Sequence, residues 1–327
     1  MATIRAPERS SATALQGEVE QLIGHARDLI DAARAASTLR AYASDWADFE
    51  SFCHRLALGA LPADPATLAL YIADMAAVRR LAASTIGRRM AAISALHVEA
   101  GHPSPTVHPQ VRRLMTGTRR TLAVEQHGKR ALTPVELRRM IAALGDDPTS
   151  VRDRAMMLAG FVGGLRRSEL DAINVGDLKL TEDGYVLTVR RSKTDQEGKT
   201  RRVALPYSTD PLLCPVRAVL EWLDAGEIDR GAVFRRIRRG GHVTRDRITA
   251  QTVGLTVKKL AKLASVNRPD ELGGHSLRSG FATAAAAAGA SERAIANQTG
   301  HRSMQVLRRY INQATTFDDN AATDLGL

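Results

Sequence analysis

Four short segments of this 327-residue chain carry side chains that could do chemistry together. They supply two arginines, two histidines, a lysine, a glutamate and a tyrosine. In chain order these are Arg166 and Glu169 in the run Gly-Leu-Arg-Arg-Ser-Glu-Leu, Lys193 in Ser-Lys-Thr, His275 and Arg278 in His-Ser-Leu-Arg, His301 in Gly-His, and Tyr310 shortly after it. Cations of this kind around a single phenol are typical of phosphate chemistry.

The tyrosine is the candidate nucleophile for attack on a phosphodiester. The pentavalent transition state gathers charge on its non-bridging oxygens, and fixed guanidinium donors stabilise that charge. A tyrosine hydroxyl, with a pKa of about 10, needs a base or positive neighbours before it can attack. A lysine or histidine can protonate the departing oxygen. His275 and Arg278 stand at positions i and i+3, so both face one way on a helix.

Each residue also has an ordinary structural explanation when it is taken singly. Arg166 and Glu169 could form a plain ion pair on a helix surface. A lysine in a polar loop is usually solvated, and a histidine near a glycine can cap a helix or occupy a turn. Tyr310 stands at helical spacing from apolar residues, a spacing typical of core packing. The ordered set, rather than any single member, favours a catalytic site.

The ordered set resembles the tyrosine recombinase (phage integrase) family. The family pattern is G-L-R-x-S-E-L, a hairpin lysine, H-x-L-R, and G-H followed by a tyrosine near the chain end. The resemblance runs from about residue 14 to the C-terminus, with the specific motifs in the second half. The first helix and the segment after Tyr310 are similar to Cre-like recombinases, while Xer-type proteins and integron integrases share the motifs. His301 departs from Cre, which has tryptophan there, and agrees with most of the family.

The resemblance implies a role for each residue of the set. These roles are phosphate clamping for Arg166 and Arg278, support of the site for Glu169, general acid catalysis on the leaving 5′ hydroxyl for Lys193, proton acceptance for His275, hydrogen-bond donation to the phosphate for His301, and formation of a 3′-phosphotyrosyl link for Tyr310. Lys199, in the same loop, is the rival for the lysine role. The implied reaction needs no ATP, because the phosphotyrosyl bond conserves the energy of the broken phosphodiester. It needs no cofactor or metal, because fixed guanidinium donors stabilise the charge of the transition state.

Composition points to a polyanionic partner. The chain holds 46 Lys and Arg, most of them Arg, against 35 Asp and Glu, for a net charge of +11. An Arg-rich, basic chain favours nucleic acid, although a GC-rich genome would also enrich arginine. At 44% hydrophobic residues the chain can bury a core, which excludes wholesale disorder. Its apolar stretches are too short for a membrane span, and two distant cysteines exclude a disulfide framework. We expect a cytoplasmic, DNA-associated protein encoded by a bacterium or a mobile element.

The elements that must position the set divide into two domains. Residues 1–13 are expected to be a flexible N-terminus. Helical periodicity predicts an all-helical domain at 14–118. The expected helices cover 14–33, residue 37 or 38 to Phe52, Pro65 to about Met75, residue 84 or 85 to His97, and 110–118. Residues 119–131 are polar and basic, as expected of a linker.

A second domain is predicted at 132–313. A Thr-Pro-Val-Glu capping box at 133–136 opens it, and alternation over 185–190 and 202–206 predicts a β-hairpin around the lysine loop. Helices are expected at about 214–225, 250–265, 276–288, 291–298 and 303–312. The fold class is therefore mainly α with two domains. The first domain is a helical bundle, and the resemblance implies that it is a core-binding (SAM-like) domain. The second is a mixed α/β, mostly helical catalytic domain with one small antiparallel sheet.

The resemblance also implies partners. The first partner is double-stranded DNA with paired inverted recognition sites. The second is other copies of the chain, which is expected to be monomeric or weakly associated when free and to form a homotetramer on DNA. The implied reaction passes through a Holliday-junction intermediate. Apolar residues at 317, 325 and 327 predict that the tail, 314–327, docks on a neighbouring protomer. The run STIGRR at 84–89 aligns loosely with the Cre helix that enters the major groove. Candidate DNA contacts are Arg40, Ser84, Arg88 and Arg89, although a solvated face would look the same.

Two other functions use parts of the same pattern. A type IB topoisomerase employs the same tyrosine, arginine, histidine and lysine chemistry and relaxes DNA without a sequence requirement. A non-enzymatic regulator is the second alternative, because residues 291–311 could form a helix-turn-helix with Gly300 at the turn. The regulator leaves Arg166, Lys193, His275 and Arg278 without a role. The small helical first domain favours a recombinase over a topoisomerase.

Overall fold

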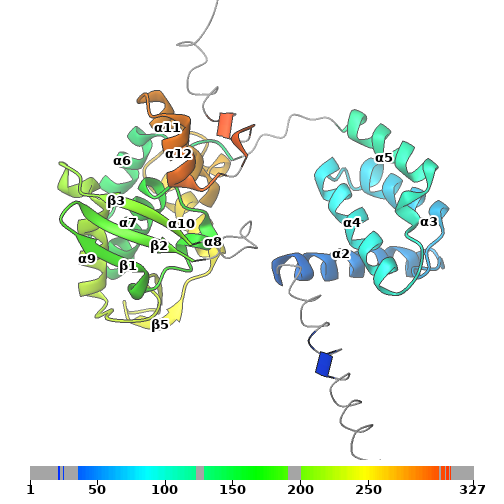
Figure 1. Cartoon of the computed structure of the whole chain (residues 1–327), viewed down its shortest axis with the longest axis horizontal. Helices are drawn as coiled ribbons and strands as arrows, with labels where there is room; N and C mark the ends of the chain where they lie inside the picture. Colours follow the sequence, from blue (N-terminus) through cyan, green and yellow to red (C-terminus); the bar gives the residue numbers. More distant parts are fainter. Residues whose placement is uncertain are drawn as a thin grey trace, which may run out of the picture. The chain divides into compact units, whose positions relative to one another are not determined.

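The computed structural model describes residues 21–22, 25, 36–122, 129–190, 200–301, 303–305, 307–308 and 310. Its contacts divide the chain into two units, residues 1–126 and 127–327, which Figure 1 shows. The division falls within the segment expected to be a linker, whose first residues belong to a helix. Most of the helix expected at 14–33, the lysine loop and the proposed docking tail lie outside the described residues.

The first unit is helical throughout the part that is described. Its helices are α2 (Ala36–Arg55), α3 (Pro65–Ala73), α4 (Ala83–Glu99) and α5 (Pro109–Thr121). Asp64 caps α3 by accepting from the backbone N–H of Ala66, and Pro65 occupies the first turn, where its missing N–H costs nothing. A π-helical turn at Asp74–Val78 continues α3, so the apolar pattern there runs past the α-helix itself. Phe49 and Phe52 both pack against Tyr71 in the core.

The second unit surrounds one buried helix. Its helices are α6 (Pro134–Ala142), α7 (Pro148–Val162), α8 (Arg167–Leu170), α9 (Pro215–Ala225), α10 (Ala250–Leu263), α11 (Gly274–Ala287) and α12 (Glu292–Thr299). Every residue of α7 from Val151 to Phe161 is buried, so this helix lies at the centre of the core. The capping box predicted at Thr133 and Glu136 is present at the start of α6.

Two sheets complete the described part of the second unit, where one had been predicted. The expected hairpin forms between β2 (Gly184–Val189) and β3 (Arg201–Pro206), and β1 (Leu178–Thr181) adds a third antiparallel strand beside β2. A separate pair, β4 (Arg235–Ile237) and β5 (Val243–Arg247), forms the second sheet. The expectation of a single sheet was wrong because β4 and β5 are short and rich in arginine. Their alternation is weak, although a Gly-Gly turn at 240–241 signals a hairpin.

Glycines bring the elements of the site close together. A Cβ on Gly280 of α11 would lie 2.2 Å from the carbonyl oxygen of Leu132, and one on Gly160 of α7 would lie 2.9 Å from the side chain of Leu277. Helix α11 therefore packs directly on α7 and on the segment before α6. The mainly α, two-domain fold class is confirmed. No helix within the described parts of the chain has the length and apolar character needed to cross a membrane.

Candidate active site

Arg166 is held at the start of α8 by the acidic residue one turn later. Its guanidinium donates from Nη1 to Glu169 Oε1 at 2.6 Å, and its backbone N–H donates to Glu169 Oε2 at 2.9 Å. The turn before it needs glycine: Gly164 has φ +55°, and a Cβ there would lie 2.8 Å from Thr299 Cγ2. The ion pair expected on a helix surface therefore exists, but Glu169 is buried. A buried carboxylate fixes the arginine more firmly than an exposed one.

Arg278 points from α11 into the same place and is 1% exposed. Its Nη1 donates to the carbonyl oxygens of Gly164, at 3.0 Å, and of Thr299. Its Nη2 is buried and has no hydrogen-bond partner among the described residues. Burial above all, with the nearby charge of Arg166, lowers the pKa of Arg278 to about 9, which leaves it protonated at neutral pH. A buried cationic N–H without an acceptor is costly, and an anionic ligand would satisfy it.

His275 and Tyr310 are in direct contact. The imidazole Nε2 lies 2.8 Å from the phenolic oxygen, although the two residues come from the start of α11 and the end of the described chain. Tyr310 is half-buried and packs against the small apolar cluster of Ala282, Ile295 and Leu307, which holds its ring. Desolvation first, and then the charge of Arg278, lowers the pKa of His275. A neutral imidazole at this distance can accept the tyrosine proton.

His301 is the second neutral imidazole of the site. Its ring lies 5.9 Å from that of Tyr310, centroid to centroid. Burial, followed by the charges of Arg278 and Arg166, lowers the pKa of His301 to about 3. Gly300, just before it, has φ +66° and ends α12 in the left-handed region, and its carbonyl oxygen accepts from Arg166 Nη2 at 3.2 Å. Arg166 thus binds both Glu169 and the turn that precedes His301.

The four segments therefore converge except for the lysine. Lys193 and Lys199 lie outside the described residues, so the structure does not locate a general acid. The remaining members place a phenol, a neutral base and a buried cationic donor around one position, where an attacked phosphate would find charge stabilisation. Among the described residues, no group of three or more His, Cys, Asp or Glu could hold a metal ion.

Comparison with known proteins identifies the family. A model of the phage integrase family matches residues 130–316, which contain every member of the set. The chain belongs to this family. An integrase/recombinase described as a XerD homologue, from Selenomonas ruminantium, is 38% identical over 307 residues, covering 92% of this chain and 89% of that protein. A tyrosine recombinase XerC from Roseiflexus sp. (strain RS-1) is 28% identical over 318 residues, covering 92% and 91%.

Solved structures of the phage integrase family share the fold. The structure of a lambda integrase (75–356) dimer bound to a core site has a TM-score of 0.57 and 17% identity, covering 89% of this chain and 93% of that one. At this identity the likeness concerns the fold alone. The relatives are named as recombinases, and the comparisons favour neither the topoisomerase nor the non-enzymatic regulator.

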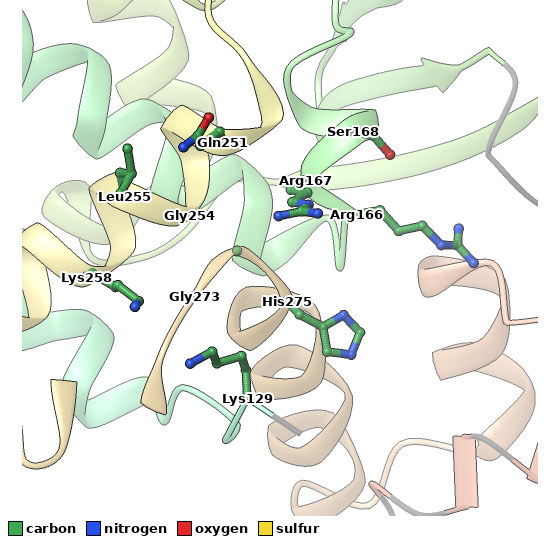
Figure 2. A pocket seen from close by; sticks show the side chains of 11 residues that line it. Lys129, Arg166, Arg167, Ser168, Gln251, Gly254, Leu255, Lys258, Gly273 and His275 are labelled. Carbon is green, nitrogen blue, oxygen red and sulfur yellow. The ribbon is translucent and has the colours of Figure 1, made fainter. Parts of the chain in front are cut away.

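A cationic pocket of about 590 Å³ adjoins the site of this integrase-family protein. Figure 2 shows Arg166 and Arg167 extending from the start of α8 in different directions, with His275 at the edge of the pocket. Lys129 and Lys258 lie on the opposite side of the same pocket. No carboxylate of the described residues lines it, and its lining includes Gly254, Gly273 and Gly274, where α10 and α11 approach each other. Such a pocket suits an anionic chain that continues past Arg166 and Arg167.

Two residues of the site were missed in the sequence. Arg201, the first residue of β3, donates from Nη2 to Glu169 Oε2 at 2.9 Å. Gln298 of α12 donates from its amide to the carbonyl oxygens of Ala204, at 2.7 Å, and of Val162, at 3.1 Å. Neither belongs to the family pattern quoted above. The available signal for Arg201 was weak: a charged residue in a short strand next to the lysine loop, where solvation is the usual outcome.

The candidate DNA contacts in the first unit fall into two groups. Ser84 and Arg88 are exposed one turn apart on α4, and Arg40 is exposed on α2. The Arg88 side chain is 45% exposed and pairs with Asp45, a contact that leaves part of the guanidinium facing solvent. These three residues are accessible to a partner. Their contact with DNA stays a prediction.

Arg89 has a different setting. Its side chain is 13% exposed, pairs with Asp48, and donates to the Tyr71 hydroxyl at 2.9 Å. Asp48 also receives two bonds from Arg79, at 2.8 and 2.9 Å, which hold the pKa of that carboxyl well below its usual range. Arg89 therefore belongs to an internal ion-pair network that ties α2 to α4. A direct contact with DNA would require breaking part of that network.

Proposed function

We propose that this protein is a site-specific DNA recombinase that breaks and rejoins strands through a covalent bond between Tyr310 and a 3′ phosphate. The observation that carries the proposal is the 2.8 Å hydrogen bond between Tyr310 Oη and His275 Nε2, beside the unpartnered Nη2 of Arg278. A nucleophile, its base and an anion donor meet there although they are far apart in the sequence. The 38% identity to the Selenomonas integrase/recombinase supports the same function.

Cleavage proceeds by transfer of a phosphoryl group from the 5′ oxygen of a phosphodiester to the tyrosine. The phenolic oxygen attacks the scissile phosphorus as its proton passes to His275, and the bond to the 5′ oxygen of the next nucleotide breaks. Arg166 and Arg278 neutralise the charge that gathers on the non-bridging oxygens. A lysine of the β2–β3 loop, Lys193 or its rival Lys199, protonates the leaving 5′ oxygen. Reversal with a 5′ hydroxyl from another strand reseals the DNA and restores the tyrosine.

DNA is the partner of the reaction, and the finer assembly is also proposed. Two protomers occupy each pair of inverted recognition sites, four form the synapse, and a Holliday junction is the intermediate. The tail, 314–327, docks on a neighbouring protomer, and the protein acts in the cytoplasm on the nucleoid. Truncation after Gln313 should abolish cooperative assembly but preserve binding to a single site. Cooperativity that survives the truncation would overturn the docking of the tail.

The proposal is tested with a suicide substrate taken from the DNA that flanks the gene. A nick next to the cleavage position lets the short fragment diffuse away, so that the covalent protein–DNA complex accumulates. The reaction is run with EDTA and without ATP. The wild type should give a covalent band that Tyr310→Phe abolishes while both bind the DNA equally. Specific binding without a covalent band would overturn the proposal, and relaxation of plasmids of any sequence would favour a topoisomerase instead.

A further inference from the structure

The carboxylate of Glu169 is shared by two guanidinium groups. Oε1 accepts from Arg166 Nη1 at 2.6 Å, and Oε2 accepts from Arg201 Nη2 at 2.9 Å. Glu169 is almost fully buried, and the side chain of Arg201 is 18% exposed. Charge-assisted bonds in such a place are strong, because water competes little for either group. Arg201 is therefore not a solvated strand residue but a second anchor of the carboxylate that positions Arg166.

Arg201 is also bound to the other side of the site. Its Nη1 donates to the carbonyl oxygen of Gln298, near the end of α12. Gly300 lies against it so closely that a Cβ there would stand 2.8 Å from Arg201 Nε. Gly300 is in turn bound by Arg166 and precedes His301. One side chain of β3 thus contacts both the acid behind Arg166 and the turn before His301.

The charge of Arg201 reaches the catalytic groups. It contributes, after burial and the closer arginines, to lowering the pKa of His301 and of Arg278. The groups whose charges lower the pKa of His301 are Arg278, Arg166, His275 and Arg201, and the Tyr310 ring lies 5.9 Å away. Glu169 is the acid shared between Arg166 and Arg201. Without a third arginine, Glu169 would neutralise a larger share of the charge on Arg166. Arg201 therefore leaves the site more positive than the family set alone would make it.

We propose that Arg201 is a positioning residue that couples the base of the β2–β3 hairpin to Arg166, through Glu169, and to the Gly300–His301 turn, through Gln298. The inference rests on the proposed recombinase function. The effect of Arg201 is on the rate of cleavage rather than on the affinity for DNA.

The test compares Arg201→Met, Arg201→Lys and the matched control Arg202→Met. Arg202 is exposed and is the next residue of the same strand, so its side chain faces the other way. With the suicide substrate, Arg201→Met should form the covalent complex at least about tenfold more slowly while its affinity for a single site stays within about threefold. Arg201→Lys, which restores one charged donor to Glu169, should recover part of the rate. Arg202→Met should cleave like the wild type.

A second readout does not depend on DNA. Amide hydrogen exchange in the segment 296–301 should accelerate in Arg201→Met, because a bond to Gln298 is lost, and should stay unchanged in Arg202→Met. Unchanged exchange in Arg201→Met, or a cleavage rate equal to that of the wild type, would overturn the role of Arg201. Failure of the wild type itself to form a covalent complex would instead contradict the proposed function, and exchange would then decide the role of Arg201 alone.

Discussion

His301 donates from Nδ1 to Thr299 Oγ1, 2.7 Å away. The direction follows from the other bond of this hydroxyl, which lies 2.6 Å from the carbonyl oxygen of Ile295 and can only donate to it. Thr299 has one hydroxyl proton, so the proton of the neutral imidazole must sit on Nδ1. The Nε2 atom then carries a lone pair. His301 can donate from Nε2 to a phosphate only after it takes up a proton.

The negative charge of a bound phosphate should favour uptake of that proton by His301. The pKa of His301 is about 3 in the free protein, and an anion beside it raises that pKa. Between the free and the bound pKa, the complex holds more protons than the free protein, so affinity for DNA should increase as pH falls from 8 to 5.5. Binding measured across this range should show a shallower increase in His301→Gln, the remainder coming from His275. Equal slopes in the two proteins would contradict proton uptake by His301.

Replacement of the Arg278 guanidinium group, with its two terminal nitrogens, should affect the rate of cleavage more than the affinity for DNA. Arg278→Lys keeps the charge but has a single nitrogen, which cannot occupy both the position of Nη1, beside the carbonyl oxygens of Gly164 and Thr299, and the position of Nη2. Two charge-assisted bonds are at stake, so the rate of covalent complex formation should fall about 100-fold. Single-turnover cleavage of the suicide substrate measures this rate, with binding measured on the same DNA. A rate within a few-fold of the wild type would mean that the orphaned Nη2 plays no part in the reaction.

Gly164 should tolerate no side chain. In Gly164→Ala, the positive φ of +55° costs about 1 kcal/mol, and the new Cβ would stand 2.8 Å from Thr299 Cγ2, which adds strain. The free energy of unfolding should therefore fall by roughly 1–3 kcal/mol, with loss of cleavage. Gly254→Ala is the control, because Gly254 lies inside α10 and its Cβ would make only an ordinary 3.7 Å contact with the backbone nitrogen of Gly274. Chemical denaturation should show Gly254→Ala to be neutral or slightly stabilising, and an equal loss in both variants would refute the conformational argument.

Substitutions of two neighbouring arginines of α4 should affect different properties, one the stability of the protein and the other its affinity for DNA. Arg89→Met removes a partly buried partner of Asp48 and Tyr71, so the free energy of unfolding should drop by about 1–3 kcal/mol. Arg88→Met should lower stability less, because the Arg88 side chain is 45% exposed and Arg89 Nε still lies 3.7 Å from the buried Asp45 carboxylate. It should weaken DNA binding and reduce the dependence of binding on salt. Denaturation and salt-dependent binding of both variants check this contrast. The reverse pattern would assign the DNA contact to Arg89.

Acid should weaken the first unit through the same network. The pKa of Asp48 lies well below its usual range, chiefly because of the bonds from Arg79, so its stabilising effect is complete at neutral pH. It is lost as pH falls below about 4, where the unfolded carboxyl takes up a proton and the folded one does not. Unfolding followed between pH 6 and pH 3 should show a smaller loss in Asp48→Asn, which starts less stable. A loss equal to that of the wild type would mean that other carboxyls govern the acid response.

The sequence by itself determined the chemistry of this protein. The Gly-Leu-Arg, His-x-x-Arg and Gly-His runs are local, and the spacing of His275 and Arg278 on one helix face needs no tertiary information. Proline and capping residues likewise marked the starts of α3 and α6, because caps are bonds between near neighbours. The buried α7 and the short β4–β5 pair gave weaker signals, since a helix buried all round has no polar face and a short strand has little alternation.

Only the tertiary structure decided how these groups act on one another. The bond between His275 and Tyr310, the two carbonyl oxygens that hold Arg278, and the sharing of Glu169 with Arg201 all join residues far apart in the chain. The neutral state of His301 and the internal pairing of Arg89 follow from burial beside charges on other elements. Spacing along the chain sets which way a side chain leaves its own helix or strand. Packing between elements sets what it meets there, and this is where charge, protonation and orientation are fixed.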